Sequence, residues 1–248
     1  MQKNFNLFRT MINELRQAIE ERSGCREPQV ERHYHKHDQY ICYGLKTPDF
    51  HRMMKEFKPR FLELSLSQRL ELAAELMSRH IGELGHAGIY VLQISAKQLR
   101  PGHFPILDSI GEDFRSWSHV DFFSTKVNPS ILFNYPEQTL QFLEKWNHSP
   151  NRFKRRASVV TFILDVAKSG RFLDDTLRFC ENLIWDDEDI VRKGVGWALK
   201  VNMSYSPRRV LEYVKDLRRR GVSSTITLYA IEKLDPQIRK EVLAIKKQ

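Results

Sequence analysis

Helical periodicity is the feature that most constrains how this chain can fold. Apolar residues recur at steps of three and four along most of it, as in the N-terminal stripe of Phe8, Met11, Ile12, Leu15 and Ile19. Gly24 predicts the end of that first helix. The best strand-like run, residues 89–92, lies inside a longer helical pattern. We therefore expect an all-α fold of about a dozen helices, each of roughly 10–18 residues.

Capping residues predict where several of these helices begin. Thr47 precedes Pro48 as an expected N-cap, with the proline at the first helical position, where its missing N–H costs nothing. Ser65 and Gln68 fit a capping box. Three further prolines each stand where a new apolar-periodic run begins: Pro136, Pro150 and Pro207, the last preceded by Ser206 as a cap.

A faint internal repeat underlies this helical pattern. Similar stretches begin at Glu83, Trp117, Arg156 and Lys193, at spacings of 34, 39 and 37 residues. Such a period, with two helices per unit, is typical of a HEAT-like solenoid, whose stacked pairs line a concave face. An irregular helical bundle is the alternative, because its helices also recur at this spacing. We expect one HEAT-like domain over residues 1–248, with residues 1–38 as an N-terminal helical extension.

Composition restricts the class of protein and its partners. The chain has 40 Lys and Arg against 31 Asp and Glu, a net charge of +9 that favours a polyanionic partner. An apolar content of 41% excludes a disordered chain. No segment has a signal peptide's pattern or approaches the roughly 18 apolar residues of a membrane span. We expect a cytoplasmic protein in a reducing compartment, because the three cysteines cannot form a disulfide framework: Cys25, Cys42 and Cys180.

Three pairs of residues, each four apart, suggest a surface for nucleic acid. Residues at this spacing share one helix face. If the three helices stand side by side, their faces form one surface with two indoles, one carboxylate and several cations, which suits phosphates, sugars and bases. The pairs are Trp117 with Asp121, Arg152 with Arg156, and Lys193 with Trp197.

Each of these residues also has a plain structural interpretation. A tryptophan in an apolar helix more often packs in the core, and we expect this of Trp146 and Trp185. Paired arginines are normally a solvated face. Asp121 differs, because its apolar neighbours suggest partial burial, and a buried carboxylate requires a partner or a purpose. The residues alone leave both a nucleic-acid enzyme and a nucleic-acid binder open.

The histidine-rich segment near the N-terminus could resemble a metal site. It contains His33, His35, His37 and Asp38, but no Cys or Glu follows at zinc-site spacing. We expect no metal here. We expect these side chains to be surface groups that face phosphate, with a charge that depends on pH.

Three collinear motifs resemble the AlkD family of DNA alkylation-repair glycosylases. They are the Trp117-x-x-x-Asp121 pair, the run Arg155-Arg156-Ala157, and the stretch VRKGVGWALK at residues 191–200. The run YGLKTP at residues 43–48 is similar to the family's entry into an early helix. The resemblance covers about residues 1–235, and the third motif is its most specific part.

The resemblance implies a HEAT-repeat base-excision-repair hydrolase. Such enzymes hydrolyse the N-glycosidic bond of cationic N3- or N7-alkylpurines in duplex DNA, without a metal or organic cofactor and without fully flipping the base. By position, Asp121 would be the catalytic carboxylate, with Trp117 and Trp197 flanking the lesion's deoxyribose. The other expected DNA contacts are Arg152, Lys154, Arg155, Arg156, Lys193 and His35. The expected protein is a monomer associated with the nucleoid.

Departures from the family's pattern keep a second hypothesis open. Phe153 stands where the family commonly has a tryptophan, and His35 where an aromatic residue is expected. The alternative is a non-catalytic HEAT-like protein that binds damaged or branched DNA. A protein-interaction scaffold would need an apolar or acidic concave face, which the basic and aromatic pairs count against. The presence of Asp121 favours the enzyme.

Overall fold

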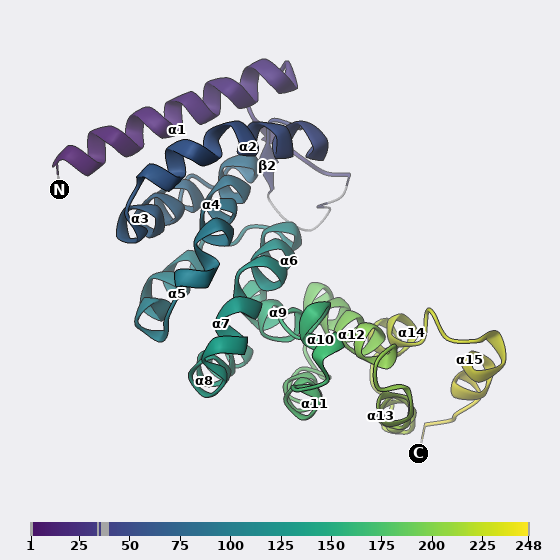
Figure 1. Ribbon diagram of the computed structural model, residues 1–248. Coiled ribbons are helices and arrows are strands. Elements are labelled where there is room, and N and C mark those ends of the chain that lie inside the picture. The colour runs from purple at the N-terminus through teal and green to yellow at the C-terminus, as the bar shows by residue number, and fades with distance from the viewer. Residues whose placement is uncertain (1, 34, 36–39, 248) are drawn as a thin grey trace. The chain divides into compact units, whose positions relative to one another are not determined.

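The computed structural model describes residues 2–33, 35 and 40–247. The chain divides into two compact units, residues 1–135 and residues 136–248 (Figure 1). Both units consist of packed helices, and this confirms the predicted all-α helical-repeat class. Among the described residues, no helix is long and apolar enough to span a membrane. The division was not predicted; whether the two units act as the single expected domain stays a prediction.

The first unit is a set of helices with one small antiparallel ladder. In the ladder Gln29 pairs with Cys42 and Val30 with Ile41. Helix α4 packs on α3 and α6, and α1 packs on α2, α3 and α4. The elements are α1 (Gln2–Ser23), β1 (Gln29–Val30), β2 (Ile41–Cys42), α2 (Thr47–Glu63), α3 (Leu66–Met77), α4 (Gly82–Ser95), α5 (Phe104–Glu112), α6 (Trp117–Lys126) and α7 (Asn128–Asn134), with two 3₁₀ turns, Ala96–Gln98 and Pro101–His103.

In the second unit, several of the helices that pack together are not neighbours in the sequence. Helix α9 packs between α8 and α12, and α12 also contacts α11, α13 and α14. The elements are α8 (Pro136–Asn147), α9 (Arg152–Val160), α10 (Asp165–Ser169), α11 (Leu173–Glu181), α12 (Asp189–Met203), α13 (Pro207–Arg219), α14 (Ser224–Ala230) and α15 (Pro236–Leu243). Of the residues that mark the expected repeat, Trp117 begins α6, whereas Glu83, Arg156 and Lys193 lie within α4, α9 and α12.

The N-terminal stripe forms the buried face of α1, as predicted. All five of its apolar residues are buried. Gly24 ends the helix with φ of +69°, and its N–H donates to the carbonyl oxygen of Glu20. With 22 residues, α1 exceeds the expected helix length, and α10, with 5, falls below it.

Two predicted caps have different outcomes. The Ser65–Gln68 capping box is confirmed, because each side chain accepts a hydrogen bond from the other residue's N–H, at 3.2 and 3.0 Å. The N-cap predicted at Thr47 is wrong. Helix α2 begins one residue earlier, since the Lys46 carbonyl oxygen accepts the first helical hydrogen bond, from the N–H of Phe50.

Helix α4 contains residues 89–92, so the helical interpretation of that run is confirmed. Two glycines on α4 allow aromatic rings to approach its backbone. A Cβ on Gly82 would lie 2.1 Å from the Tyr40 hydroxyl, and one on Gly85 would lie 2.7 Å from the His119 ring. These two contacts position the rings beside the site described next.

Candidate functional site

Helix α6 presents the Trp117–Asp121 pair on successive turns. The Ser116 hydroxyl caps the helix by accepting a hydrogen bond from the N–H of His119 at 3.2 Å, which makes Trp117 the first helical residue. The Trp117 side chain is 36% exposed, so it is not a core residue. Asp121 is half-buried, as its apolar neighbours predict.

His35 packs against Trp117. The two rings stack at a centroid distance of 5.1 Å with an interplanar angle of 22°, and Tyr40 lies 4.1 Å away from His35. His35 is 7% exposed. The expectation of a surface histidine is therefore wrong for this residue, because two aromatic rings cover it. Its role as a DNA contact stays a prediction, and His37 and Asp38 lie outside the described residues.

The ring contacts continue from His35 into the first unit. Tyr40 meets His119 edge-on at 5.6 Å, and His119 lies 4.5 Å from His86. His86 in turn stacks on Phe122, with ring centroids 5.9 Å apart. An unbroken series of rings thus connects Trp117, at the start of α6, with Phe122 one turn beyond Ser118.

The half-buried His86 and the buried His119 are both held neutral. Each donates a ring N–H to the carbonyl oxygen of Gly82, from Nδ1 of His86 at 2.8 Å and from Nε2 of His119 at 3.0 Å. Burial lowers the pKa of His86 to about 4, and burial, followed by the nearby His86, lowers the pKa of His119 well below its ordinary value. The buried Nδ1 of His119 has no acceptor in contact, so protonating it would create an unsatisfied donor.

Four rings of this series, those of His35, Tyr40, His86 and Phe122, form part of the wall of a cavity of about 740 Å³, here named the α6 cavity. Among its lining residues His35, Tyr40, Phe50 and Glu83 are buried, whereas Lys46, His51 and Lys126 are exposed. Helix α6 contributes every fourth residue to the wall, at positions 118, 122 and 126. The lining residues are Glu31, His35, Tyr40, Cys42, Gly44, Leu45, Lys46, Thr47, Phe50, His51, Glu83, His86, Ser118, Phe122 and Lys126.

Glu83 is a buried carboxylate in the wall of the α6 cavity. Its two oxygens accept hydrogen bonds from the backbone N–H groups of Tyr43 and Leu45, at 3.0 and 3.1 Å. These bonds fix the loop that follows β2. Burial and the Glu83 charge raise the pKa of the nearby Cys42 thiol to about 11. Glu83 therefore contributes negative charge to the cavity wall and was not identified from the sequence.

In the second unit, two of the expected DNA contacts form ion pairs within the protein. The Arg155 guanidinium binds Asp186 through two hydrogen bonds, from Nε at 2.6 Å and from Nη2 at 3.2 Å. Its Nη1 donates to the carbonyl oxygens of Ser149 and Pro150. Arg152 pairs with Glu188 at 3.1 Å. Phosphate would have to compete with these carboxylates for both guanidinium groups.

Two other expected contacts are buried. Lys154 is 2% exposed, and its Nζ lies 5.8 Å from the Trp146 ring centroid. Arg156 is 6% exposed and donates from Nη1 to the carbonyl oxygen of Ile190 at 2.6 Å, with its chain lying across Gly194 of α12. Both side chains have packing roles, and their role toward DNA stays a prediction.

Helix α12 carries the last pair, Lys193 and Trp197. The Lys193 side chain is 55% exposed and pairs with Asp189 at 2.7 Å, and Trp197 is half-buried. The core position predicted for Trp146 is confirmed, but that predicted for Trp185 is wrong. Trp185 is 61% exposed because it lies in the turn between α11 and α12, outside any helix stripe.

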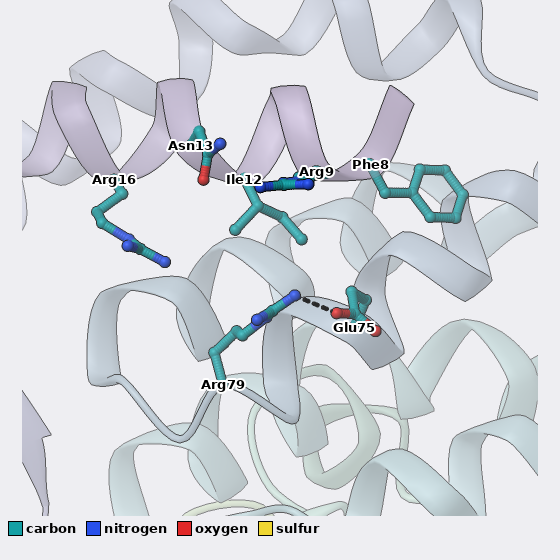
Figure 2. Close-up of a pocket in the computed structure, with 7 residues that line it drawn as sticks. All are labelled: Phe8, Arg9, Ile12, Asn13, Arg16, Glu75 and Arg79. Carbon is teal, nitrogen blue, oxygen red and sulfur yellow. Dashed lines mark hydrogen bonds and ion pairs between the residues drawn. The ribbon is translucent and has the colours of Figure 1, made fainter. Parts of the chain in front are cut away.

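A second cavity of the first unit, about 320 Å³, is lined by three arginines that were not predicted from the sequence to have a function (Figure 2). It lies between α1 and α3, where Arg16 projects from α1 and Arg79 from the turn that follows α3. Arg79 pairs with Glu75. Arg9 and Arg16 form no hydrogen bond or ion pair with any described residue, and the Arg16 Nε is buried. The three guanidinium groups and one carboxylate favour an anion.

Within the described part of the chain, no three His, Cys, Asp or Glu side chains group in a way that could hold a metal ion. All three cysteines are free.

Comparisons with known proteins place this chain among repair proteins. A family model described as "DNA alkylation repair enzyme" matches residues 15–234. A structure described as a predicted DNA alkylation repair enzyme from Enterococcus faecalis is 15% identical, with a TM-score of 0.73 over 83% of this chain and 93% of that one. The crystal structure of smu.31 from Streptococcus mutans UA159 is 17% identical, with a TM-score of 0.56 over 75% and 98%. At these identities the two structures show a shared fold alone. No curated protein matches the sequence.

Proposed function

Because the chain belongs to the family of DNA alkylation repair enzymes, we propose that it is a DNA glycosylase for cationic alkylated purines. The bond hydrolysed is the N-glycosidic bond of an N3- or N7-alkylpurine in duplex DNA. The observation that carries this proposal is the pair on α6: a half-buried carboxylate, Asp121, one turn from the partly exposed Trp117. Asp121 is the proposed catalytic carboxylate.

The chemistry of the lesion explains why a carboxylate and an indole suffice for hydrolysis of the N-glycosidic bond. Alkylation at a ring nitrogen puts positive charge on the purine and makes it a good leaving group. As the bond to the base breaks, the sugar gains oxocarbenium character, which the Asp121 carboxylate stabilises while it positions the attacking water. The face of the Trp117 indole attracts the same positive charge. The departing base needs no strong general acid and no cofactor.

His35 has a positioning role in this proposal. Its ring packs on Trp117 and also on Tyr40. These ring contacts hold the Trp117 indole in place. An indole fixed in this way loses little conformational freedom when it meets a sugar. The DNA contact expected of His35 stays a prediction beside this role.

DNA binding is proposed to draw on both units. In the first unit Arg9 and Arg16 are available for phosphate, since no described carboxylate pairs with them. In the second unit the exposed Lys193 and the half-buried Trp197 are the proposed contacts, with Arg152 exchanging its carboxylate partner for phosphate. Each phosphate neutralised releases counterions, so binding should weaken with salt.

The test is base release from methylated duplex DNA. Purified protein is incubated with DNA treated with a methylating agent, and the released bases are identified by mass spectrometry. The proposal predicts free 3-methyladenine or 7-methylguanine, and no release from untreated DNA. Protein that retards duplex DNA but releases no base would instead support the non-catalytic binder of damaged or branched DNA.

A further inference from the structure

We propose that the second cavity of the first unit binds a phosphomonoester group, carried by the end of a DNA strand or by a free phosphate compound. This cavity of about 320 Å³ between α1 and α3 is here named the arginine pocket, after Arg9, Arg16 and Arg79. The proposed function, which this deepens and on which it rests, gives Arg9 and Arg16 to phosphate in general. The pocket adds a third guanidinium group and a preference for a doubly charged phosphate.

One stripe of α1 supplies the polar side of the arginine pocket. Arg9, Asn13 and Arg16 are spaced by four and three residues, so they share one face of the helix. This face borders the buried stripe of α1, from which Phe8 also lines the pocket. Figure 2 shows Asn13 and Arg16 extending from α1 toward the side where Arg79 lies. The packing of α1 on α3 therefore brings donors from two segments of the chain to one space.

The charges of the arginine pocket match a phosphomonoester. Its three guanidinium groups keep their charge in proteins, and Glu75 is the one carboxylate among its described lining residues, which leaves an excess of two positive charges. A phosphomonoester carries about 1.5 to 2 negative charges near pH 7, whereas a phosphodiester of the DNA backbone carries one. The monoester is the closer match.

The positive charge of α1 is not neutralised within the described part of the protein. Arg9 and Arg16 form no hydrogen bond or ion pair with any described residue, and the Arg16 Nε is buried without an acceptor. Glu20, one turn beyond Arg16, accepts a hydrogen bond from the Tyr43 hydroxyl at 3.2 Å. A buried N–H group without an acceptor is unfavourable, and an oxygen of a bound phosphate would satisfy it. Guanidinium groups bind phosphate through two parallel hydrogen bonds, which suits this site.

The experiment compares two DNA duplexes that differ in one group. Both have the same sequence of undamaged bases, but one carries 5′-phosphates and the other 5′-hydroxyls. Fluorescence anisotropy, with the dye at a 3′ end, measures the affinity of the full chain for each. We expect the phosphorylated duplex to bind about tenfold more tightly, a difference of about 1.4 kcal/mol.

A second arm distinguishes the source of the phosphate. Inorganic phosphate is titrated into the protein by calorimetry, with sodium chloride of the same ionic strength as the reference. Preference for the phosphorylated duplex without binding of inorganic phosphate assigns the pocket to DNA ends. Binding of inorganic phosphate without a duplex preference assigns it to a free phosphate compound. Equal duplex affinities together with no binding of inorganic phosphate overturn the inference.

Variants locate the binding. Arg16→Gln also weakens contact with backbone phosphate, so the quantity compared is the ratio of the two duplex affinities, beside the affinity for inorganic phosphate. We expect Arg16→Gln and Arg79→Gln each to lower these values about fivefold or more. Arg52→Gln is the matched control, because Arg52 is an exposed arginine of α2 that does not line the pocket. Equal losses in Arg52→Gln and the two pocket variants contradict the assignment, as does no loss in Arg16→Gln.

A gain of binding tests the pocket even if the arginine variants fail to fold, which circular dichroism checks. Glu75 pairs with Arg79 and competes with phosphate for it. Glu75→Gln removes this competition, so we expect the same preference for phosphate to rise about two- to fivefold. An unchanged or lower preference in Glu75→Gln contradicts the pocket.

Base release separates this inference from the proposed function. Protein that prefers phosphomonoesters but releases no methylated base refutes the glycosylase and supports the pocket. Protein that releases methylated bases but shows neither phosphate preference refutes the pocket alone.

Discussion

The neutral histidine under the α6 cavity predicts a specific loss of stability in acid. Burial lowers the pKa of His86 in the folded protein to about 4, against roughly 6.5 in the unfolded chain. Between these values the unfolded state binds more protons, so the contribution of His86 to stability is full above about pH 6.5 and is lost as the pH falls toward about 4. At about 1.4 kcal/mol per pKa unit, lowering the pH from about 7.5 to about 4.5 should remove about 2.5 kcal/mol through this residue.

The variant His86→Asn tests this directly. An asparagine amide can still donate to the Gly82 carbonyl oxygen but does not titrate. Urea unfolding of wild type and variant, followed by circular dichroism at the two pH values, should show a smaller acid loss in the variant. His148→Asn is the control, because His148 is exposed in the turn that follows α8. If wild type and His86→Asn lose the same free energy of unfolding, the assignment of a neutral His86 is wrong.

Three further predictions follow from contacts described above. Arg9→Gln and Arg16→Gln should each weaken duplex binding and flatten the slope of log affinity against log salt by about 0.9, measured by fluorescence anisotropy. Arg52→Gln, which lies outside the arginine pocket, should do neither. Asn147→Ala should destabilise the second unit by roughly 1–3 kcal/mol in urea unfolding, since its amide donates to the Ser158 hydroxyl and the Phe179 carbonyl oxygen; an unchanged midpoint would refute this. Trp185→Ala should change the unfolding free energy by less than about 0.5 kcal/mol, and a larger loss would show that Trp185 packs in the core.

The helices could be predicted from the sequence because their signals are local. The stripe from Phe8 to Ile19 repeats with the period of a helix, and the Ser65–Gln68 box lies within one turn. Even here, α2 begins one residue before its predicted start. The Lys46 carbonyl oxygen accepts the first helical hydrogen bond, and this backbone bond does not depend on the type of side chain.

The site could be predicted only in part, because burial and pairing depend on residues far away in the sequence. The spacing of Trp117 and Asp121 placed both on one helix, but nothing local shows that the His35 ring would cover the indole. The burial of Lys154 depends on the Trp146 ring and could not be inferred from the charge pattern. Likewise, the Tyr40 ring packs against Gly82, and this contact could not be predicted because Tyr40 lies far from Gly82 in the sequence.

The most direct test of the proposed chemistry is single-turnover release of 7-methylguanine from a defined methylated duplex, comparing wild type with Asp121→Asn. Asparagine keeps the shape of the side chain and removes its charge, so duplex affinity, measured in parallel, should stay within about twofold. Loss of a carboxylate that stabilises the oxocarbenium ion should slow release by about 10²–10³-fold, the effect of removing one electrostatic stabiliser. Release at the wild-type rate by Asp121→Asn, with the variant folded and bound to DNA, would contradict the account.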